Sequence, residues 1–284
     1  MKKLFTVLLW SVVASAALAF TPVSAPTGEV VVPLRVLDRN NMMLVDCKVD
    51  GVPCTLIFDT GATHTSLDRA FAARALPDAK TEEVVVTGET NVRDKPVSVT
   101  VKTLSVGDAE FGGFSVMSVN LGHLSGTVGT KVDGVLGMNV ISRVPCLLSA
   151  GTGKAVFNPS EGRLEGFGQK VRSASPDPLE IAFGMRNRSG RFAILVDSGA
   201  SFTFMNSRHW PKAEGDVDLG ASDVNGKGAM KATRGATAPL QLGTPIEITP
   251  LVGDDAPDCI GADTLKRYDM LIEAPFARFR ALKQ

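Results

Sequence analysis

Short apolar runs rich in β-branched residues recur along most of the chain, and many alternate with polar positions. In the first half these runs cover residues 30–36, 44–49, 54–58, 84–87, 97–106 and 114–120. In the second half they cover residues 192–196, 240–242, 246–252 and 270–273. Such runs have the length and composition of half-buried or buried strands. The pattern therefore predicts a protein built mainly from strands.

Helical periodicity is confined to short segments, at residues 66–75, 138–142 and 263–267. Residues 158–178 are rich in Gly, Pro, Ser and charge and show no periodicity, which is typical of a linker. The glycine-containing segment 121–131 is expected to be a mobile loop near a cleft. The linker divides the chain into an N-terminal lobe, 20–157, and a C-terminal lobe, 179–284.

One short phrase occurs in both halves of the chain. Leu-Ile-Phe-Asp-Thr-Gly-Ala stands at 56–62 and Ile-Leu-Val-Asp-Ser-Gly-Ala stands at 194–200. An apolar run that ends in Asp-Thr/Ser-Gly predicts a buried strand leading into a tight turn, where glycine permits a close backbone approach. Two such turns would hold two carboxylates, those of Asp59 and Asp197, against each other.

The repeat extends beyond this phrase. Gly88 and Gly226 each follow the aspartate of their half by 29 residues. Each half then reaches a late apolar pair followed by glycine, Val-Leu-Gly at 135–137 and Cys-Ile-Gly at 259–261. The chain therefore contains one duplication, not the several units of a solenoid.

These four motifs, in this order, resemble the aspartic peptidases of the pepsin and retropepsin superfamily. The resemblance covers nearly the whole chain after its first residues. It implies an all-β, bilobal acid-protease fold, in which two retropepsin-like β-barrel lobes are related by pseudo-two-fold symmetry. A single chain would then supply what two retropepsin subunits supply, so we expect a monomer.

The resemblance also implies the roles of particular residues. Two neighbouring carboxylates share one proton, as they do in pepsin, so one can activate water while the other donates to a peptide carbonyl. The expected residues are the catalytic pair Asp59 and Asp197, the supporting loop residues Thr60, Gly61, Ser198 and Gly199, and the flap glycines Gly88 and Gly226, which would contact substrate.

Two departures from the pepsin pattern affect the expected chemistry. Alanine follows both Asp-Thr/Ser-Gly motifs, as in retropepsins, where pepsins carry Ser or Thr. Without that hydroxyl the pair should hold its proton to higher pH, which predicts a mildly acidic to near-neutral optimum. The only tyrosine is Tyr268, so the flap tyrosine of pepsins is missing and a glycine-tipped flap is expected.

Charge and composition narrow the function further. The formal net charge is zero, and no basic stripe occurs, so nucleic-acid binding is not expected. The three histidines are isolated and no Gly-x-Ser-x-Gly occurs, so neither a metal site nor a serine hydrolase is expected. We expect no cofactor and no metal.

The first 19 residues have the parts of an export signal. Lys2 and Lys3 precede an apolar stretch, and Ala-Leu-Ala at 17–19 resembles a cleavage site. We therefore expect a periplasmic or secreted protein with no stable membrane span once the signal is removed; a retained N-terminal anchor is the alternative.

The cysteines give a further expectation. Cys47 and Cys54 flank an Asp-Gly hairpin turn, so a disulfide between them is expected, with two reduced buried thiols as the alternative. Cys146 and Cys259 are expected in the core.

Two function classes stay open. The first is an exported aspartic endopeptidase that acts on peptide or protein substrates. The second is a non-catalytic descendant that keeps the fold and binds peptides or proteins. The presence of both aspartates and both glycines favours catalysis. A dimer with exchanged lobes is a third possibility for the assembly.

Overall fold

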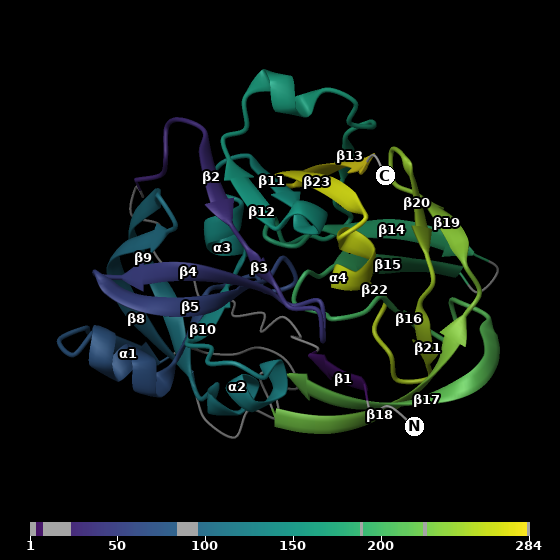
Figure 1. Cartoon of the computed structure of the whole chain (residues 1–284), viewed down its shortest axis with the longest axis horizontal. Helices are drawn as coiled ribbons and strands as arrows, with labels where there is room; N and C mark the ends of the chain where they lie inside the picture. The colour runs from purple at the N-terminus through teal and green to yellow at the C-terminus, as the bar shows by residue number, and fades with distance from the viewer. Residues whose placement is uncertain (1–3, 8–23, 84–95, 188–189, 224–225, 283–284) are drawn as a thin grey trace.

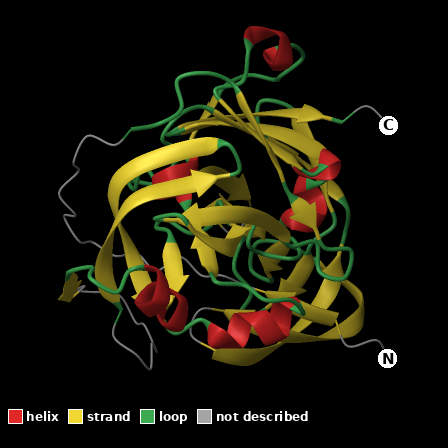
Figure 2. Ribbon diagram, turned by 60° about the vertical axis from the view of Figure 1, so that its left-hand side comes forward, coloured by secondary structure: helices red, strands yellow, loops and turns green. Residues whose placement is uncertain are grey.

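The computed structural model describes residues 4–7, 24–83, 96–187, 190–223 and 226–282. Within these ranges the framework consists almost entirely of strands, and the helices are short (Figures 1 and 2). Two lobes stand side by side below a sheet to which both contribute (Figure 1). The expected all-β, two-lobe fold is confirmed.

The N-terminal lobe contains a closed ring of six strands. The ring runs through β4 (Met43–Val49), β5 (Val52–Phe58), β10 (Gly134–Leu136), β6 (Ser66–Asp68), β9 (Ala109–Val119) and β8 (Val97–Val106). It closes because β4 also pairs with β8, with Cys47 opposite Val106. The strands β3 (Arg35–Val36) and β7 (Thr81–Glu83) extend it. Closure pairs strand edges that would otherwise be open.

The C-terminal lobe contains an eight-stranded sheet in the described residues. Its order is β1 (Leu4–Val7), β17 (Lys212–Asp223), β18 (Gly226–Gly235), β21 (Leu251–Gly253), β16 (Phe204–Asn206), β22 (Cys259–Ile260), β15 (Gly190–Val196) and β14 (Ala182–Asn187). A separate hairpin joins β19 (Ala238–Gln241) to β20 (Pro245–Ile248). The strand β1, from the expected signal segment, pairs in parallel with β17.

The two lobes repeat one set of pairings around the Asp-Thr/Ser-Gly motifs. In the first lobe β10 runs parallel to β5 and antiparallel to β6, and β6 runs parallel to β9. In the second lobe β22 runs parallel to β15 and antiparallel to β16, and β16 runs parallel to β21. The duplication of the sequence is therefore a duplication of topology.

A six-stranded sheet joins the lobes. Its order is β13 (Val171–Arg172), β24 (Phe276–Ala281), β23 (Tyr268–Glu273), β11 (Cys146–Ser149), β12 (Lys154–Phe157) and β2 (Val30–Pro33). At its centre β11 of the first lobe pairs with β23 of the second. The main buried apolar cluster includes aromatic residues of both lobes, among them Phe58, Phe157, Phe183 and Phe279. One core therefore continues from lobe to lobe.

The helices are α1 (Arg69–Ala75), α2 (Gly122–Val128), α3 (Met138–Ile141) and α4 (Ala262–Leu265), with the 3₁₀ turns η1 (Ala150–Thr152) and η2 (Glu161–Leu164). The predicted helix at 66–75 begins only at Arg69, because Ser66 and Leu67 pair with neighbouring strands and Asp68 caps the helix. The other two predicted helices, 138–142 and 263–267, correspond to α3 and α4.

The expectation of a loop at 121–131 is wrong, because α2 occupies most of it. Leu124, Thr127 and Val128 form its buried side, and Gly129 ends it in the left-handed conformation. The apolar members pack with Leu44 and Ile57 of the first lobe. The buried residues have the i, i+3, i+4 spacing of one helical face, but the glycines in this segment favoured a loop in the sequence-based prediction.

Most predicted strands are present with shifted ends. The run 246–252 divides into β20 and β21 on either side of Pro250, and the run at 114–120 is the end of a longer strand, β9. The predicted strand at 84–87 lies outside the described residues. Within the predicted linker, 158–178, η2 and β13 form, and β13 pairs with β24. Leu164 and Phe167 pack over Leu147 and Leu271 on one face of the joining sheet.

The expected disulfide between Cys47 and Cys54 is wrong, although the two residues are directly opposite as predicted. Both are free and buried. Pro53 has no N–H and so takes a non-hydrogen-bonded position, which puts the next pair, Cys47 and Cys54, in the more widely spaced hydrogen-bonded position. In that position the two Cβ atoms are about 5.5 Å apart, farther than the Cβ separation of about 3.8 Å in a disulfide. Cys146 and Cys259 are also free and buried.

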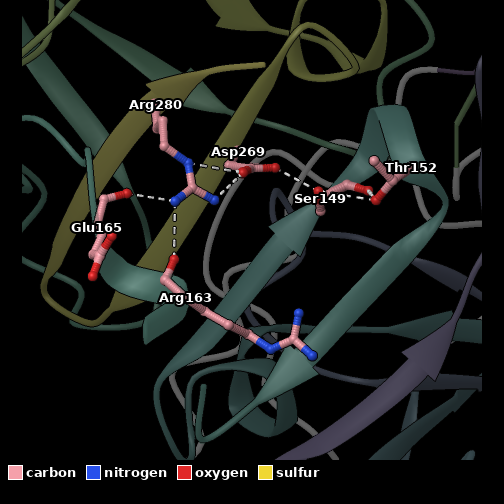
Figure 3. A network of polar contacts seen from close by, with 6 residues as sticks. All are labelled: Ser149, Thr152, Arg163, Glu165, Asp269 and Arg280. Carbon is pink, nitrogen blue, oxygen red and sulfur yellow. Dashed lines mark hydrogen bonds and ion pairs between the residues drawn. The ribbon is translucent and has the colours of Figure 1, made fainter. Parts of the chain in front are cut away.

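A polar network fastens the linker to the joining sheet (Figure 3). Arg280 on β24 forms an ion pair with the buried Asp269 on β23. The guanidinium also donates to the carbonyl oxygens of Arg163 and Glu165, at 3.0 and 2.6 Å. The hydroxyl of Ser149 on β11 donates to the other oxygen of Asp269. One carboxylate thus connects β11, β23, β24 and, through Arg280, the linker.

We expect Arg280→Ala to lower the free energy of unfolding by about 2 kcal/mol, because it leaves Asp269 buried without its cation; the partial exposure of Arg280 places the effect below that of a fully buried pair. Urea denaturation measures this change. The matched control is Arg278→Ala on the same strand, whose partner Glu273 is more exposed, and it should cost less than about 1 kcal/mol. Equal losses in the two variants would contradict the assignment.

Candidate active site

The motif strands β5 and β15 deliver Asp59 and Asp197 to one place between the lobes. Each strand is held by the late apolar-apolar-Gly element of its own lobe. The amide of Asp59 donates to the carbonyl of Leu136 at 3.0 Å, and the amide of Asp197 donates to that of Ile260 at 3.0 Å. The same bond thus fixes both aspartates where their strands end.

Each aspartate accepts hydrogen bonds from the turn that follows it. Oδ1 of Asp59 accepts from the amides of Gly61 and Ala62, at 2.8 and 3.2 Å. Oδ1 of Asp197 accepts from the amides of Gly199 and Ala200, at 2.8 and 3.0 Å. These bonds hold one oxygen of each carboxyl and orient the other.

The hydroxyl residues cross between the lobes. The amide of Thr60 donates to Oγ of Ser198 at 2.9 Å, and the amide of Ser198 donates to Oγ1 of Thr60 at 3.0 Å. Each hydroxyl then donates to a strand of the opposite lobe, Thr60 to the carbonyl of Val196 and Ser198 to that of Phe58, both at 2.8 Å. All four residues are buried, so the exchange is shielded from water.

Gly61 and Gly199 lie directly against the carboxyl of the opposite lobe. A Cβ built on Gly61 would lie 2.4 Å from Cγ of Asp197, and one built on Gly199 would lie 2.4 Å from Cγ of Asp59. No side chain fits at such a distance. The absence of a Cβ at both glycines is therefore what lets the two carboxyls meet.

Burial changes the acidity of both groups. The exposed fraction of Asp59 is 0%, and that of Asp197 is 3%. Burial raises the pKa of Asp59 to about 6 against the opposing effect of the Gly61 amide. Burial raises the pKa of Asp197 well above its ordinary value, and the charge of Asp59 raises it further. Such a pair retains one proton near neutral pH, which gives it an acid and a base together.

Sequence reasoning missed the residues that support the two turns from behind. In the first lobe Oδ1 of Asn139 accepts from the amide and the hydroxyl of Thr65, both at 2.8 Å. In the second lobe Oδ1 of Asp263 accepts from the amide and the hydroxyl of Thr203, also at 2.8 Å. A shared spacing could have found them, since each acceptor stands two residues after the last glycine of its lobe's late motif.

The structure describes only one of the two expected flap glycines. Gly88 lies outside the described residues. Gly226 begins β18, opposite Asp223 of β17, at the tip of a long hairpin of the second lobe. The structure thus brings together Asp59, Asp197, Thr60, Ser198, Gly61 and Gly199, and it places Gly226 on a hairpin.

No cluster of three or more potential metal ligands occurs among the described residues. In the same part of the chain, no helix is long and apolar enough to cross a membrane.

A known protein family matches the first lobe of the chain. Residues 45–140, about a third of the chain, match the aspartyl protease family. This region includes Asp59 and the first late glycine motif. The resemblance to aspartic peptidases of the pepsin and retropepsin type is thereby confirmed.

A crystal structure of a retropepsin-like aspartic protease from Rickettsia conorii is similar at 17% identity. The match covers 49% of this chain and 96% of that one, with a TM-score of 0.33. No curated protein sequence matches the chain.

We expect Gly61→Ala and Gly199→Ala each to destabilise the protein by about 3 kcal/mol or more, since the added methyl group would overlap the opposite carboxyl. Thermal unfolding measures the effect. The matched control is Gly126→Ala in α2, where a Cβ meets nothing within 4 Å and alanine favours the helix. If all three variants melt at the temperature of the unchanged protein, the close approach of the two turns is contradicted.

We expect the free energy of unfolding to fall as the pH rises from about 4 to about 6. The pKa of Asp59 is raised on folding, so the folded chain binds more protons than the unfolded chain in this window, and protonation favours folding there. The loss should be about 2 kcal/mol for this group. Urea denaturation across the pH range measures it.

The variant Asp59→Asn should flatten this dependence, because it removes the carboxyl whose pKa is raised to about 6 on folding. The control Asp254→Asn removes an acid from the surface of the same lobe and should leave the slope above pH 4 unchanged. An identical slope in Asp59→Asn and the unchanged protein would show that Asp59 does not titrate in this window.

Proposed function

We propose that the protein is an exported aspartic endopeptidase that hydrolyses peptide bonds with water activated by Asp59 and Asp197. The observation that carries this proposal is the meeting of two buried carboxyls, one from each lobe, on matched turns. The alternative, two unrelated aspartates that cap strand ends, does not account for glycine and hydroxyl contacts that repeat across both lobes.

The chemistry follows from one shared proton. The ionised carboxylate takes a proton from the water as it attacks the peptide carbonyl. The protonated carboxyl donates to the carbonyl oxygen, and a proton then passes to the leaving amine. The crossed Thr60 and Ser198 bonds hold both turns still, so the carboxyls stay in place as the proton moves. A pKa of about 6 for Asp59 favours activity near neutral pH, in keeping with the alanines at 62 and 200.

The substrate is an extended peptide that lies across the junction of the lobes. The hairpin of β17 and β18, with Gly226 at its tip, belongs to the C-terminal lobe, where a flap is expected. Gly88 has the same position in the repeat of the N-terminal lobe. Because both carboxyls come from one chain, the active unit is a monomer, which equilibrium sedimentation would test against an exchanged dimer.

Export rests on the sequence of the first 19 residues. The charged start, the apolar stretch and the Ala-Leu-Ala site support a signal that is removed before Phe20. The activity is therefore assigned to the periplasm or the exterior.

We expect the mature chain to cleave an unbiased peptide mixture between pH 3 and pH 8, with pepstatin as a competitor. Asp59→Asn and Asp197→Asn should each lower kcat/KM by about a thousandfold or more, because each removes half of the acid–base pair while preserving shape. Mass spectrometry of the products measures cleavage. Asp254→Asn, on the surface, should retain full activity.

A folded protein that cuts nothing at any pH would overturn the proposal and favour a peptide-binding descendant. Cleavage that persists in both aspartate variants would overturn the mechanism and leave the fold unaffected. Circular dichroism of each variant ensures that a loss of activity is not a loss of folding.

A further inference from the structure

The supports behind the two catalytic turns share three hydrogen bonds. The amide of Gly137 donates to Oγ1 of Thr65 at 3.1 Å, and the amide of Gly261 donates to Oγ1 of Thr203 at 3.1 Å. Each threonine then donates its hydroxyl and its amide to one Oδ1, in the four bonds of 2.8 Å given above. In both lobes the same distances connect the late glycine to the residue two positions beyond it.

The acceptors differ in charge. In the first lobe the acceptor is Asn139, a neutral amide, and in the second lobe it is Asp263, a carboxyl. The second lobe also supplies a further donor, because the amide of Thr264 lies 2.7 Å from Oδ1 of Asp263. Burial raises the pKa of Asp263, and the bonds from Thr203 and Thr264 oppose that rise. An oxygen that faces three donors is in the environment of an ionised carboxylate.

All hydrogen-bonding positions of the Thr203 hydroxyl are occupied. It donates its one proton to Asp263 and accepts from the amide of Gly261, and the hydroxyl of Thr264 lies 2.7 Å away as a second donor to it. A hydroxyl offers one donor and two acceptor positions, so all three are used. The saturated hydroxyl of Thr203 therefore keeps its bond to Oδ1 of Asp263 in one geometry.

Asp263 is linked to the turn of Asp197 through the backbone of its own lobe. The amide of Ala262, the residue before Asp263, donates to the carbonyl of Ala200 at 2.8 Å, and the amide of Ala200 donates to Oδ1 of Asp197 at 3.0 Å. The negative charges of three nearby aspartates raise the pKa of the buried Cys259 thiol. The largest of these effects comes from Asp197, and the other two come from Asp263 and Asp258. Arg267, two residues after α4, lowers the pKa of Asp263 through its positive charge. In the described residues the corresponding position of the first lobe, Asn139, brings no charge to Asp59.

Asp59 itself needs a donor. Among the described residues, its Oδ2 is buried and has no hydrogen-bond partner, whereas Oδ1 accepts from two amides. A buried carboxylate oxygen without a donor is costly. A proton held by the facing carboxyl would supply the missing bond.

We propose that Asp263 is a positioning residue whose negative charge breaks the symmetry of the catalytic pair, keeps the shared proton on Asp197 and leaves Asp59 as the base. The charge disfavours a second negative charge on Asp197, in the same lobe, more than on Asp59, in the other. The inference rests on the proposed function for its catalytic meaning, since it assigns the two roles within that mechanism. The placement of the proton is a property of the folded protein and does not depend on turnover.

Carbon-13 NMR of aspartate carboxyls in the mature chain tests the proposal, with the signals of Asp59 and Asp197 assigned through Asp59→Asn and Asp197→Asn. We expect the Asp197 signal to lose its proton at higher pH than the Asp59 signal. In Asp263→Asn the midpoint of Asp197 should fall by about half a pH unit or more. In Asn139→Asp the midpoint of Asp59 should rise by a similar amount.

Asp254→Asn is the matched control, because it removes one surface carboxylate of the same lobe and should move neither midpoint. Asp263→Asn gives the second lobe the same acceptor residue that the first lobe has at position 139. If Asn139→Asp does not fold, the Asp263→Asn titration alone therefore tests the proposal. A folded Asp263→Asn with unmoved midpoints, or a proton that resides on Asp59, would overturn the proposal.

A second readout separates this inference from the proposed function. If the chain cleaves peptides, the basic limb of the kcat/KM profile should move to lower pH in Asp263→Asn and stay unmoved in Asp254→Asn. If the chain cleaves nothing, the proposed function fails while the NMR titration still decides where the proton lies. If NMR shows the expected shift but the basic limb of the kcat/KM profile does not move, Asp263 has no role in the catalytic mechanism.

Discussion

The contact of each glycine with the carboxyl of the other lobe is the constraint on which the candidate active site depends. Gly61 lies against Asp197, and Gly199 lies against Asp59, at a separation that leaves no space for a Cβ. The crossed bonds of Thr60 and Ser198 hold the turns at this separation. Because the two carboxyls are held together in a buried place, they cannot both ionise easily, and the protonation state of the pair follows from packing.

The joining sheet makes that contact possible. Its central pairing, β11 with β23, fixes the lobes to each other at a distance from the Asp-Thr/Ser-Gly turns. The network of Asp269, Arg280 and Ser149 secures the sheet and the linker that covers it (Figure 3). The turns of the two aspartates are joined to each other by the crossed hydroxyls. Within each lobe, Asn139 or Asp263 supports the turn through a threonine. A shift of one lobe relative to the other would therefore disturb both the joining sheet and the contacts between the two turns.

The sequence indicated the two lobes, the Asp-Thr/Ser-Gly turns and the strands before them, because those features are local. An apolar run that ends in Asp-Thr/Ser-Gly has one good structural reading, and its recurrence at matched spacing supports that reading. Local reasoning failed where glycine concealed a helical face, as in α2, and at short strands such as β6, β16 and β22. These strands have two or three residues and exist only because partners distant in sequence pair with them. The cysteine pair was placed correctly, but its bonding state depended on the hydrogen-bonding position of the ladder.

The sequence by itself determined that two equivalent acids exist, that each ends a buried strand, and that a glycine follows each one. Only the tertiary structure decided that each glycine serves the opposite acid, and that Asn139 and Asp263 stand at equivalent positions with different charge. The physical reason is the sequence separation over which each interaction acts. Periodicity and turn chemistry act over a few residues, whereas the meeting of carboxyls, their burial and the resulting pKa shifts arise from residues more than a hundred positions apart.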